Sequence, residues 1–430
     1  MSSKRATILI IGVLVCAPLL ALHHFGVFRE LADWLERIYK QIFTLPEARL
    51  TRLVLLQYGF YTVMAFCSAW VCAEMPRLSR KFGFIFGAAF LTLILSPALA
   101  FNGLLFEPLS GVLAILVAGL LGIAISGTEK GQRAHVLRPF FIGRLSEDAF
   151  EQLVSSKELP TLTGRRELTV LSCRVLNCAE LATELEPAEM EKLSSSFLKT
   201  AAEFLVSKGA YLDSCNEDGV RVLFGFPLND DQHATTACKA AIELRQRLVE
   251  FSQEIENRWH KKPALGVALA SGDVTCGLFG FSDFQFYGAV GEALDFSQRL
   301  CSINVVYGSH VLLDSRTFHL AQEAIEVRPM EMVTMPKVHA VSEIYELLSG
   351  KGALSDAEVK ARDAFWQGVV HLRKADTKSA LDSFQKARIE GKDDVPLRYF
   401  TERAEAGSKG DTAATDPKGS ARHVRLLTGG

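Results

Sequence analysis

The sequence lacks both a concentration of positive charge and any recognisable cysteine pattern. Its 430 residues carry 47 Lys and Arg against 49 Asp and Glu, for a formal net charge of -2. Binding to nucleic acid phosphates needs clustered basic charge, so no nucleic acid partner is expected. The nine cysteines are scattered, without a CxxC pair or a Cys/His ligand spacing. Neither a disulfide framework nor a zinc site is therefore expected, and the second half of the chain is predicted to be reduced and cytosolic.

Charged residues are also scarce in the first third of the chain, where long apolar runs replace them. Each run is long enough to cross about 30 Å of hydrocarbon as a helix rising about 1.5 Å per residue. The four runs cover residues 6–22, 53–73, 82–101 and 105–126. Burying four such helices in a soluble core would need a far larger domain. We therefore predict an α-helical membrane domain of about four spans over residues 1–127.

The first apolar run has a second interpretation. Lys4 and Arg5 before an apolar stretch are also typical of a signal peptide. No small-x-small cleavage site follows Leu22. An uncleaved span is favoured, and a cleaved signal peptide is the alternative.

Basic residues near the ends of the spans predict the orientation of the membrane domain. They lie between the second and third runs and after the fourth, with none between the third and fourth. They are Arg77, Arg80, Lys81, Lys130, Arg133 and Arg138. This pattern places the C-terminal half in the cytoplasm. The basic loop 28–52 disagrees, but its apolar residues have helical spacing, so we predict an amphipathic helix at the interface with membrane lipid as its partner.

Beyond residue 128, charges are frequent and the pattern alternates between strands and helices. Residues 128–165 are predicted to be a connector that includes a polar helix at 146–156. Strands are predicted at 167–175, 210–213, 219–225, 265–269, 274–278 and 310–314, and helices at 187–208, 230–258 and 292–303. Gly272-Asp273 is predicted as a hairpin turn. The order β-α-β-β-α-β indicates an α+β ferredoxin-like domain over residues 166–348, with helices on one face of an antiparallel sheet.

Two blocks in this domain match a known family. In the first, Val222 to Ala241, a strand ends in Phe-Gly, a Pro loop follows, and a helix opens with His233-Ala. The second block, Gly266 to Gly280, is marked by glycines, and the residues after it keep the spacing of the family's next block. The positions concerned are Gly272, Gly277, Gly280, Tyr287, Gly291, Arg299 and Leu300. In order and spacing, residues 166–348 resemble the catalytic domain of class III adenylyl and guanylyl cyclases of the bacterial membrane-bound type.

This resemblance implies a dimer that acts on a nucleoside triphosphate. In the family, two aspartates hold two magnesium or manganese ions, which activate the 3′-hydroxyl and neutralise the triphosphate. An Asn and an Arg of the partner chain stabilise the phosphates. A Lys and an Asp or Thr read the purine. The site therefore needs both chains of a homodimer or heterodimer.

Only some of the corresponding positions hold the family residue. Asp218 matches the second metal aspartate and Arg299 the transition-state arginine. The substituted positions are Arg174 (first metal aspartate), Ser214 and Gly288 (purine-reading) and Asp295 (transition-state Asn). A guanidinium offers a hard divalent ion no oxygen ligand. Two-metal catalysis is therefore not expected in a homodimer, and a pseudoenzyme is the favoured interpretation.

Several of these residues have a structural alternative. Asp218 suits a hairpin turn as well as a metal or nucleotide contact. Arg299 is either a surface ion-pair residue or a phosphate contact. Arg174 either pairs with Asp218 across the strands or binds a ligand phosphate. His233 is expected to pack or cap at the start of its helix, and the glycines to shape the hairpin backbone.

Residues 355–405 are predicted to form a short helical pair. Gly368, Ala380, Phe384 and Ala387 fit the tetratricopeptide spacing, and residues 396–403 resemble an element that follows some bacterial membrane cyclases. Since one repeat cannot form a solenoid, an amphipathic pair packed on the cyclase-like domain is favoured over a tetratricopeptide-like unit. Residues 406–430 are predicted to be disordered.

Three functional hypotheses follow. The leading one is a degenerate cyclase-like signalling protein, anchored in a bacterial inner (cell) membrane and acting as a regulatory or dimerisation module. The second is an active adenylate or guanylate cyclase, a phosphorus-oxygen lyase using magnesium or manganese. The third is a non-enzymatic membrane interaction protein.

Overall fold

The computed structural model describes residues 3–42, 51–52, 54–75, 78–127, 129–156, 159–282, 284–334 and 341–409. The chain divides into two compact units. The first comprises Met1–Pro139 with Val154–Ser156, and the second Phe140–Leu153 with Lys157–Gly430.

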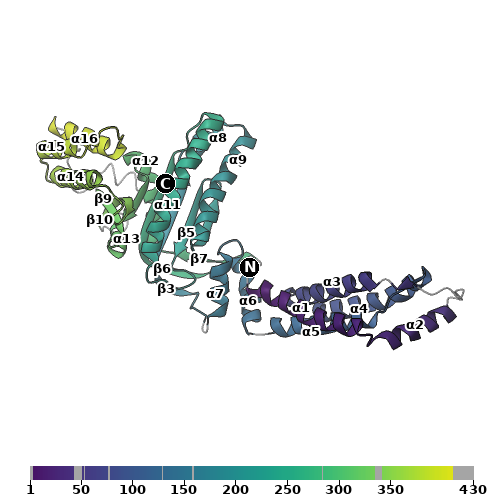
Figure 1. Cartoon of the computed structure of the whole chain (residues 1–430). Coiled ribbons are helices and arrows are strands. Elements are labelled where there is room, and N and C mark those ends of the chain that lie inside the picture. Colours follow the sequence, from purple (N-terminus) through teal and green to yellow (C-terminus); the bar gives the residue numbers. More distant parts are fainter. Residues whose placement is uncertain are drawn as a thin grey trace. The chain divides into compact units, whose positions relative to one another are not determined.

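The first unit is a bundle of helices (Figure 1). It contains α1 (Ser3–His24), α2 (Arg29–Ile42), α3 (Val54–Glu74), α4 (Leu78–Phe101) and α5 (Leu109–Ser126). Small side chains let α3 and α5 approach closely, as is common between helices in lipid. A Cβ atom added at Gly122 of α5 would lie 2.8 Å from the carbonyl oxygen of Ala69 on α3.

The number of helices that could span a membrane is three or four in the described part of the chain. Helices α3, α4 and α5 are each long and apolar enough, and α1 and α2 qualify together only as a single span bent by 71°. The expected number of about four agrees with the upper value. The helix of the fourth predicted run, α5, begins at Leu109 and not at residue 105 as expected. Residues Leu104–Leu105 form strand β2 instead, which pairs in parallel with β1 (Thr51–Arg52).

Helix α2 covers most of the described part of the predicted amphipathic segment, and residues 43–50 of that segment lie outside the described residues. One face of α2 is attached to the end of the bundle, in a cluster of Ala32, Leu35, Ile38 and Tyr39 with Ala100 and Leu105. Trp34 and Ile42 are exposed, at 51% and 65%. Its position at a lipid interface stays a prediction.

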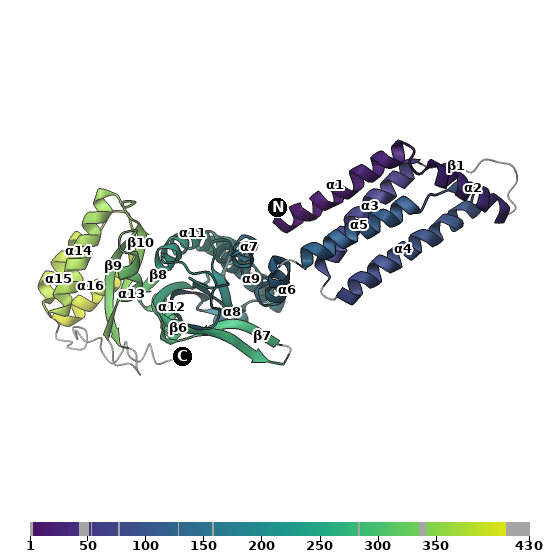
Figure 2. The ribbon, with the colours of Figure 1, turned by 90° about the horizontal axis from the view of Figure 1, so that it is seen from below.

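The second unit is built on an eight-stranded sheet with the order β4-β5-β3-β6-β8-β10-β9. Strand β7 pairs with β6, and the two lie side by side in Figure 2. The strands are β3 (Gly164–Val175), β4 (Tyr211–Asn216), β5 (Gly219–Phe224), β6 (Leu265–Phe281), β7 (Phe284–Val290), β8 (Val311–Asp314), β9 (Ile325–Thr334) and β10 (Val341–Gly350). The pairing of β6 with β8 is parallel, whereas the other pairs are antiparallel. The expectation of an antiparallel sheet was therefore wrong for this one pair of strands.

Helices cover both faces of this sheet. The helices around it are α7 (Glu147–Ser155), α8 (Cys178–Glu184), α9 (Pro187–Leu198), α10 (Phe204–Ser207), α11 (His233–Trp259), α12 (Glu292–Tyr307) and α13 (Ser315–Ala321), and α6 (Glu129–Phe141) precedes them. Leu171 and Cys173 of β3 share a core with α11, whereas Ser172 between them bonds to Ser297 of α12 at 2.9 Å. Because successive strand residues point to opposite faces, α11 and α12 lie on opposite faces. The expectation of helices on one face only was wrong.

The hairpin predicted at Gly272-Asp273 is also wrong. Residues 265–281 form the single strand β6, in which Gly272 lies opposite Leu168 of β3. The register with β3 runs without a shift from Leu265 to Cys276, through Gly272, as it does in a continuous strand. The chain reverses instead after Phe281. Gly280, with a φ of +125°, belongs to that reversal, since an added Cβ atom would collide with the carbonyl oxygen of Phe284. Gly277 lies within β6, opposite Gly288.

The C-terminal segment contains three helices, α14 (Asp356–Arg373), α15 (Thr377–Lys386) and α16 (Val395–Ser408), rather than the predicted pair. Gly368 of α14 is covered by the ring of Phe384 of α15. Helix α16 continues into the segment predicted to be disordered, and residues 410–430 lie outside the described residues.

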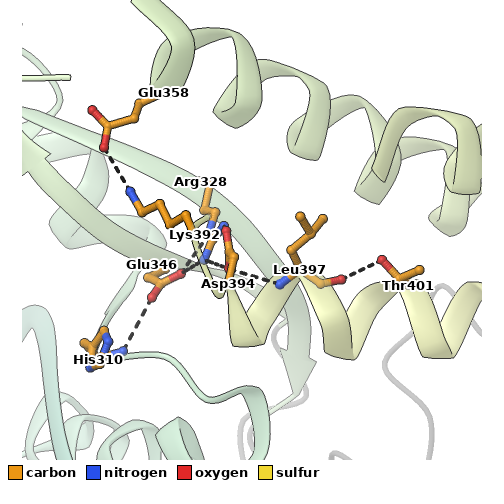
Figure 3. A network of polar contacts seen from close by, with 8 residues as sticks. All are labelled: His310, Arg328, Glu346, Glu358, Lys392, Asp394, Leu397 and Thr401. Carbon is orange, nitrogen blue, oxygen red and sulfur yellow. Dashed lines mark hydrogen bonds and ion pairs between the residues drawn. The ribbon is translucent and has the colours of Figure 1, made fainter. Parts of the chain in front are cut away.

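These helices are attached to β9 and β10 by charged side chains. Figure 3 shows Arg328 of β9 between Glu346 of β10 and Asp394, the N-cap of α16. Arg328 Nη1 donates to Asp394 Oδ2 at 2.6 Å, and Nε donates to Glu346 Oε2 at 2.7 Å. Three further pairs join the same elements: Arg362 with Glu326, Arg373 with Glu343 and Arg403 with Glu331.

Candidate functional site

The two metal positions of the family lie side by side in the fold. Arg174 lies near the end of β3, opposite Gly219 of β5, and Asp218 lies in the turn just before β5. Arg174 Nη2 donates to Asp218 Oδ2 at 2.5 Å. The pairing across the strands, one of the two interpretations of Arg174, is therefore present.

The local backbone holds this pair in place. The carbonyl oxygen of Asp218 accepts a hydrogen bond from Val175 N at 2.8 Å, which fastens the turn to β3. A Cβ atom added at Gly219 would lie 2.8 Å from Arg174 Cγ. The stem of Arg174 therefore lies across Gly219, and Asp218 serves both as a turn residue and as an ion-pair partner.

The ion pair keeps a permanent positive charge at the first metal position. Both side chains are partly buried, at 31% and 24% exposure. Burial opposes the charge on Arg174, but the hydrogen bond and charge of Asp218 outweigh it and raise the pKa of the guanidinium.

The residues present do not fit a two-metal site. A divalent magnesium or manganese ion needs several oxygen ligands, and Asp218 is already engaged by a guanidinium. Over the described ranges, no three His, Cys, Asp or Glu side chains are grouped so that they could hold a metal ion.

The two purine-reading positions lie on β4 and β7, with Asp213 joining these strands. Asp213 Oδ1 accepts a hydrogen bond from Ala289 N at 3.3 Å, and Oδ2 accepts one from Arg221 Nε at 2.8 Å. Ser214 follows Asp213, and Gly288 precedes Ala289. The fold thus brings Ser214 and Gly288 into one region through a buried carboxylate that the sequence analysis did not single out.

Gly288 is tightly packed by neighbouring side chains. An added Cβ atom would lie 3.3 Å from the rings of Phe279 and Phe286, and 3.4 Å from Asp213 Oδ1. A threonine at this position would require these neighbours to move by a few tenths of an ångström.

The transition-state positions form a pair of their own on α12. Arg299 Nε donates to Asp295 Oδ2 at 2.8 Å, one helical turn away, and the two side chains are 30% and 53% exposed. This geometry is that of a surface ion pair, which contributes little to stability. It agrees with the surface interpretation of Arg299, and a role toward phosphate stays a prediction.

His233 occupies the start of α11, where it packs against the sheet. Its Nδ1 lies 2.7 Å from Thr169 Oγ1, and Thr169 continues the chain of hydroxyl groups to Ser271 at 2.7 Å. Burial lowers the pKa of His233, so the ring is neutral near neutral pH. The packing role expected for this residue agrees with these contacts.

One residue of the predicted connector reaches the candidate site. Arg144 Nη1 donates to the carbonyl oxygens of Leu212 and Asp213, at 3.0 and 2.8 Å, and the Arg144 carbonyl oxygen accepts from Leu212 N at 2.8 Å. Nearby, the ring of Phe141 stacks on Tyr287 at 5.5 Å. No sequence signal identified Arg144, because the groups it binds are backbone carbonyls, which every residue carries.

Comparison with known proteins gives a consistent picture. No family model matches the chain. It is 22% identical over 182 residues to an adenylate cyclase of Anabaena cylindrica, which covers 39% of this chain and 35% of that protein. It is 20% identical over 194 residues to adenylate cyclase 1 of Rhizobium meliloti (strain 1021), which covers 45% of this chain and 29% of that protein. The chain is similar to class III adenylyl and guanylyl cyclases. The resemblance predicted from the sequence is confirmed by these cyclase relatives, of whose length the matched region spans about a third.

Solved cyclase structures match the same share of the chain. The guanylyl cyclase Cya2 is 22% identical, with a TM-score of 0.42, and covers 45% of this chain and 98% of its own. The adenylyl cyclase CyaB of P. aeruginosa is 23% identical, with a TM-score of 0.41, and covers 45% of this chain and 99% of its own.

Proposed function

We propose that this cyclase-like chain is a membrane-anchored signalling protein that does not form a cyclic nucleotide itself. It acts as a regulatory or dimerisation module, in a homodimer or a heterodimer, in a bacterial inner membrane with its C-terminal half in the cytoplasm. The ion pair between Arg174 and Asp218 at the two metal positions is the observation that carries this proposal.

The charge at this pair supports the absence of turnover. A metal ion would have to separate Asp218 from Arg174 and would then be repelled by the guanidinium. At about 4 Å and an effective dielectric constant near 20, each pair of unit charges interacts by about 4 kcal/mol, and a divalent ion doubles that figure. Without the ions, the negative charge of a bound triphosphate is not neutralised here, because the ion pair of Arg174 and Asp218 carries no net charge.

The other substituted positions support the same conclusion. Asp295 places a carboxylate where the family has a neutral amide, and that carboxylate already engages Arg299. Ser214 lacks the amine of the purine-reading lysine. The remaining alternatives are an active cyclase, which the names of the two curated relatives favour, and a non-enzymatic interaction protein.

The direct experiment measures cyclic AMP and cyclic GMP formation by the full chain in lipid nanodiscs, with ATP or GTP and with magnesium or manganese. We expect no turnover above that of empty nanodiscs. Robust turnover by the wild-type chain would contradict the proposal and favour the active cyclase.

A gain-of-function series sharpens this experiment. We expect Arg174→Asp, combined with Ser214→Lys and Asp295→Asn, to recover measurable cyclase activity that depends on a divalent ion. Gly288→Thr is added last, because its neighbours must move. Arg316→Asp is the matched control, because it makes the same charge change in a different ion pair, with Glu167. This control should gain no activity.

Manganese binding to Arg174→Asp, measured by electron paramagnetic resonance, separates loss of the metal site from loss of the fold. We expect the variant to bind the ion and the wild-type chain not to.

A further inference from the structure

A cluster of buried polar side chains lies at one end of the helical bundle, apart from the cyclase-like site. Gln57 and Tyr61 of α3 and Glu107, which precedes α5, are exposed by only 5%, 0% and 2%. His23, in the last turn of α1, packs against the same group. Ionisable groups within a membrane bundle are costly to bury, and those retained commonly have a function.

The carboxylate of Glu107 receives several donors. Its Oε1 accepts a hydrogen bond from Leu109 N at 2.8 Å, and its Oε2 accepts one from the hydroxyl of Tyr61 at 3.2 Å and another from Ser110. An ionised carboxylate has acceptors only, so this arrangement suits the charged form. These bonds also tie the start of α5 to α3.

His23 packs against Tyr61, which bonds this carboxylate. Its ring lies 5.3 Å from that of Tyr58 and 5.7 Å from that of Tyr61, and it interacts with the side chain of Gln57 and with the charge of Glu107. Its Nδ1 is buried and has no hydrogen-bond partner among the described residues. The titratable groups that face the ring are thus Tyr58, Tyr61 and Glu107.

Two acidic side chains of the neighbouring α2 are engaged elsewhere. Asp33 and Glu36 of α2 both pair with Arg52. Glu107 is therefore the negative charge that acts on the His23 ring, and from α5 itself the hydroxyl of Ser110 reaches that carboxylate.

We propose that His23 and Glu107 form a proton-binding site in the bundle. Histidine is the side chain whose ordinary titration falls between about pH 5 and pH 8. A proton taken up at Nδ1 turns a site with one negative charge into a neutral ion pair. It also supplies a new donor, which competes with Tyr61 and Ser110 for the carboxylate. Proton occupancy is thereby coupled to the bonds that join α1, α3 and α5. The proton site itself does not depend on the proposed function. Only its use as an input for signalling rests on that proposal.

The experiment uses the full chain, labelled with ¹³C-histidine and held in lipid nanodiscs, with the imidazole resonances followed from about pH 5 to about pH 8. His23→Gln identifies the His23 resonance by its absence. We expect that resonance to titrate within the range. We also expect Glu107→Gln to move its midpoint by at least about half a pH unit toward lower pH, because the amide no longer stabilises the charged ring. His24→Gln, at the exposed neighbouring residue, is the matched control and should leave the midpoint unchanged.

A His23 resonance that does not titrate in this range, or a midpoint unaffected by Glu107→Gln, would overturn the inference. Circular dichroism checks the fold of each variant. If Glu107→Gln does not fold, Tyr61→Phe replaces it. That variant removes a competing donor and should move the midpoint toward higher pH, and an unchanged midpoint there also overturns the inference. Cyclic nucleotide formation by the wild-type chain would refute the proposed function and leave this titration as it is, so the two can fail separately.

Discussion

Asp314 shows how strongly the environment of one residue sets its charge. The side chain is only 6% exposed, and its Oδ1 accepts hydrogen bonds from Thr317 N at 2.9 Å and Ser271 N at 3.3 Å. Burial raises the pKa of Asp314 above its ordinary value, and these hydrogen bonds offset only part of that effect. The folded state therefore holds this proton more tightly than the unfolded chain does.

The pH dependence of stability follows from the direction of this shift. A carboxyl whose pKa is raised by folding contributes stability that is present below its unfolded pKa, about 3.9, and is lost as pH rises through the folded value. Asp314→Asn, whose amide oxygen can accept the same bonds, should remove that loss. Thermal unfolding from about pH 4 to about pH 7 should show a flatter stability profile in the acid range. Asp382→Asn, at an exposed surface pair, should retain the wild-type profile. An unchanged profile in Asp314→Asn would refute this account.

Among the elements, the attachment of the C-terminal helices is the feature with the greatest consequence for stability. Arg328 is buried, is paired with both Glu346 and Asp394, and lies 4.6 Å from the ring of Phe365. Asp394 also caps α16 by accepting a hydrogen bond from Leu397 N at 3.1 Å. One carboxylate thus both starts a helix and anchors it to the sheet.

Asp394→Ala should destabilise the second unit by about 3 kcal/mol, because it removes a partner from a buried charge as well as a helix cap. Thermal unfolding measures the loss, and limited proteolysis should show earlier cleavage in α16. Asp393→Ala is the matched control. Asp393 is 71% exposed and pairs with Arg398, so its loss should cost less than about 0.5 kcal/mol. Equal effects of the two variants would contradict the anchoring role.

Local patterns predicted most of the helices and the central strands, and they failed where the deciding contact was distant. Gly272-Asp273 has the composition of a turn, but the ladder with β3 carries the strand straight through it. Strands β9 and β10 were not predicted, although charged residues such as Glu331 alternate there with apolar ones. The partners of these charged side chains lie on later helices.

The same limit applies to the candidate site. The pair of Arg174 and Asp218 could be anticipated because opposite charges faced one another across predicted strands. Asp295 and Arg299 are four residues apart, a spacing that alone predicts an ion pair on a helix. Asp213 and Arg144 were not anticipated. Arg144 binds backbone carbonyl groups, which carry no sequence signal. Asp213 binds the backbone of β7, and the position of β7 beside β6 depends on where the chain reverses.

At the scale of the whole molecule, the chain consists of two compact units, each with its own buried core. The boundary at Phe140 and the three C-terminal helices matter for any soluble fragment. A fragment of residues 145–350 would lack Arg144 and the three C-terminal helices. It would leave Arg328 without Asp394 and Glu331 without Arg403.

We therefore expect residues 140–409 to be soluble and to unfold cooperatively without the membrane helices, and residues 145–350 to melt at a lower temperature or to aggregate. Size-exclusion chromatography and circular dichroism of both fragments test this. If the shorter fragment were as stable as the longer one, the connector and C-terminal helices would not be integral to the unit.

The position of Arg174 over Gly219 has a consequence for how such a site could change. Because the glycine provides no Cβ atom, the long side chain fills space beside Asp218 that a shorter aspartate would leave vacant. With an aspartate there, the vacant space would be bordered by two carboxylates, that of Asp218 and that of the new side chain. It would be open to water, and a hydrated ion could bind in it. Arg174 thus occupies the volume of the site as well as placing a positive charge there. Replacing it by an acidic residue would both free that volume and change the charge from positive to negative.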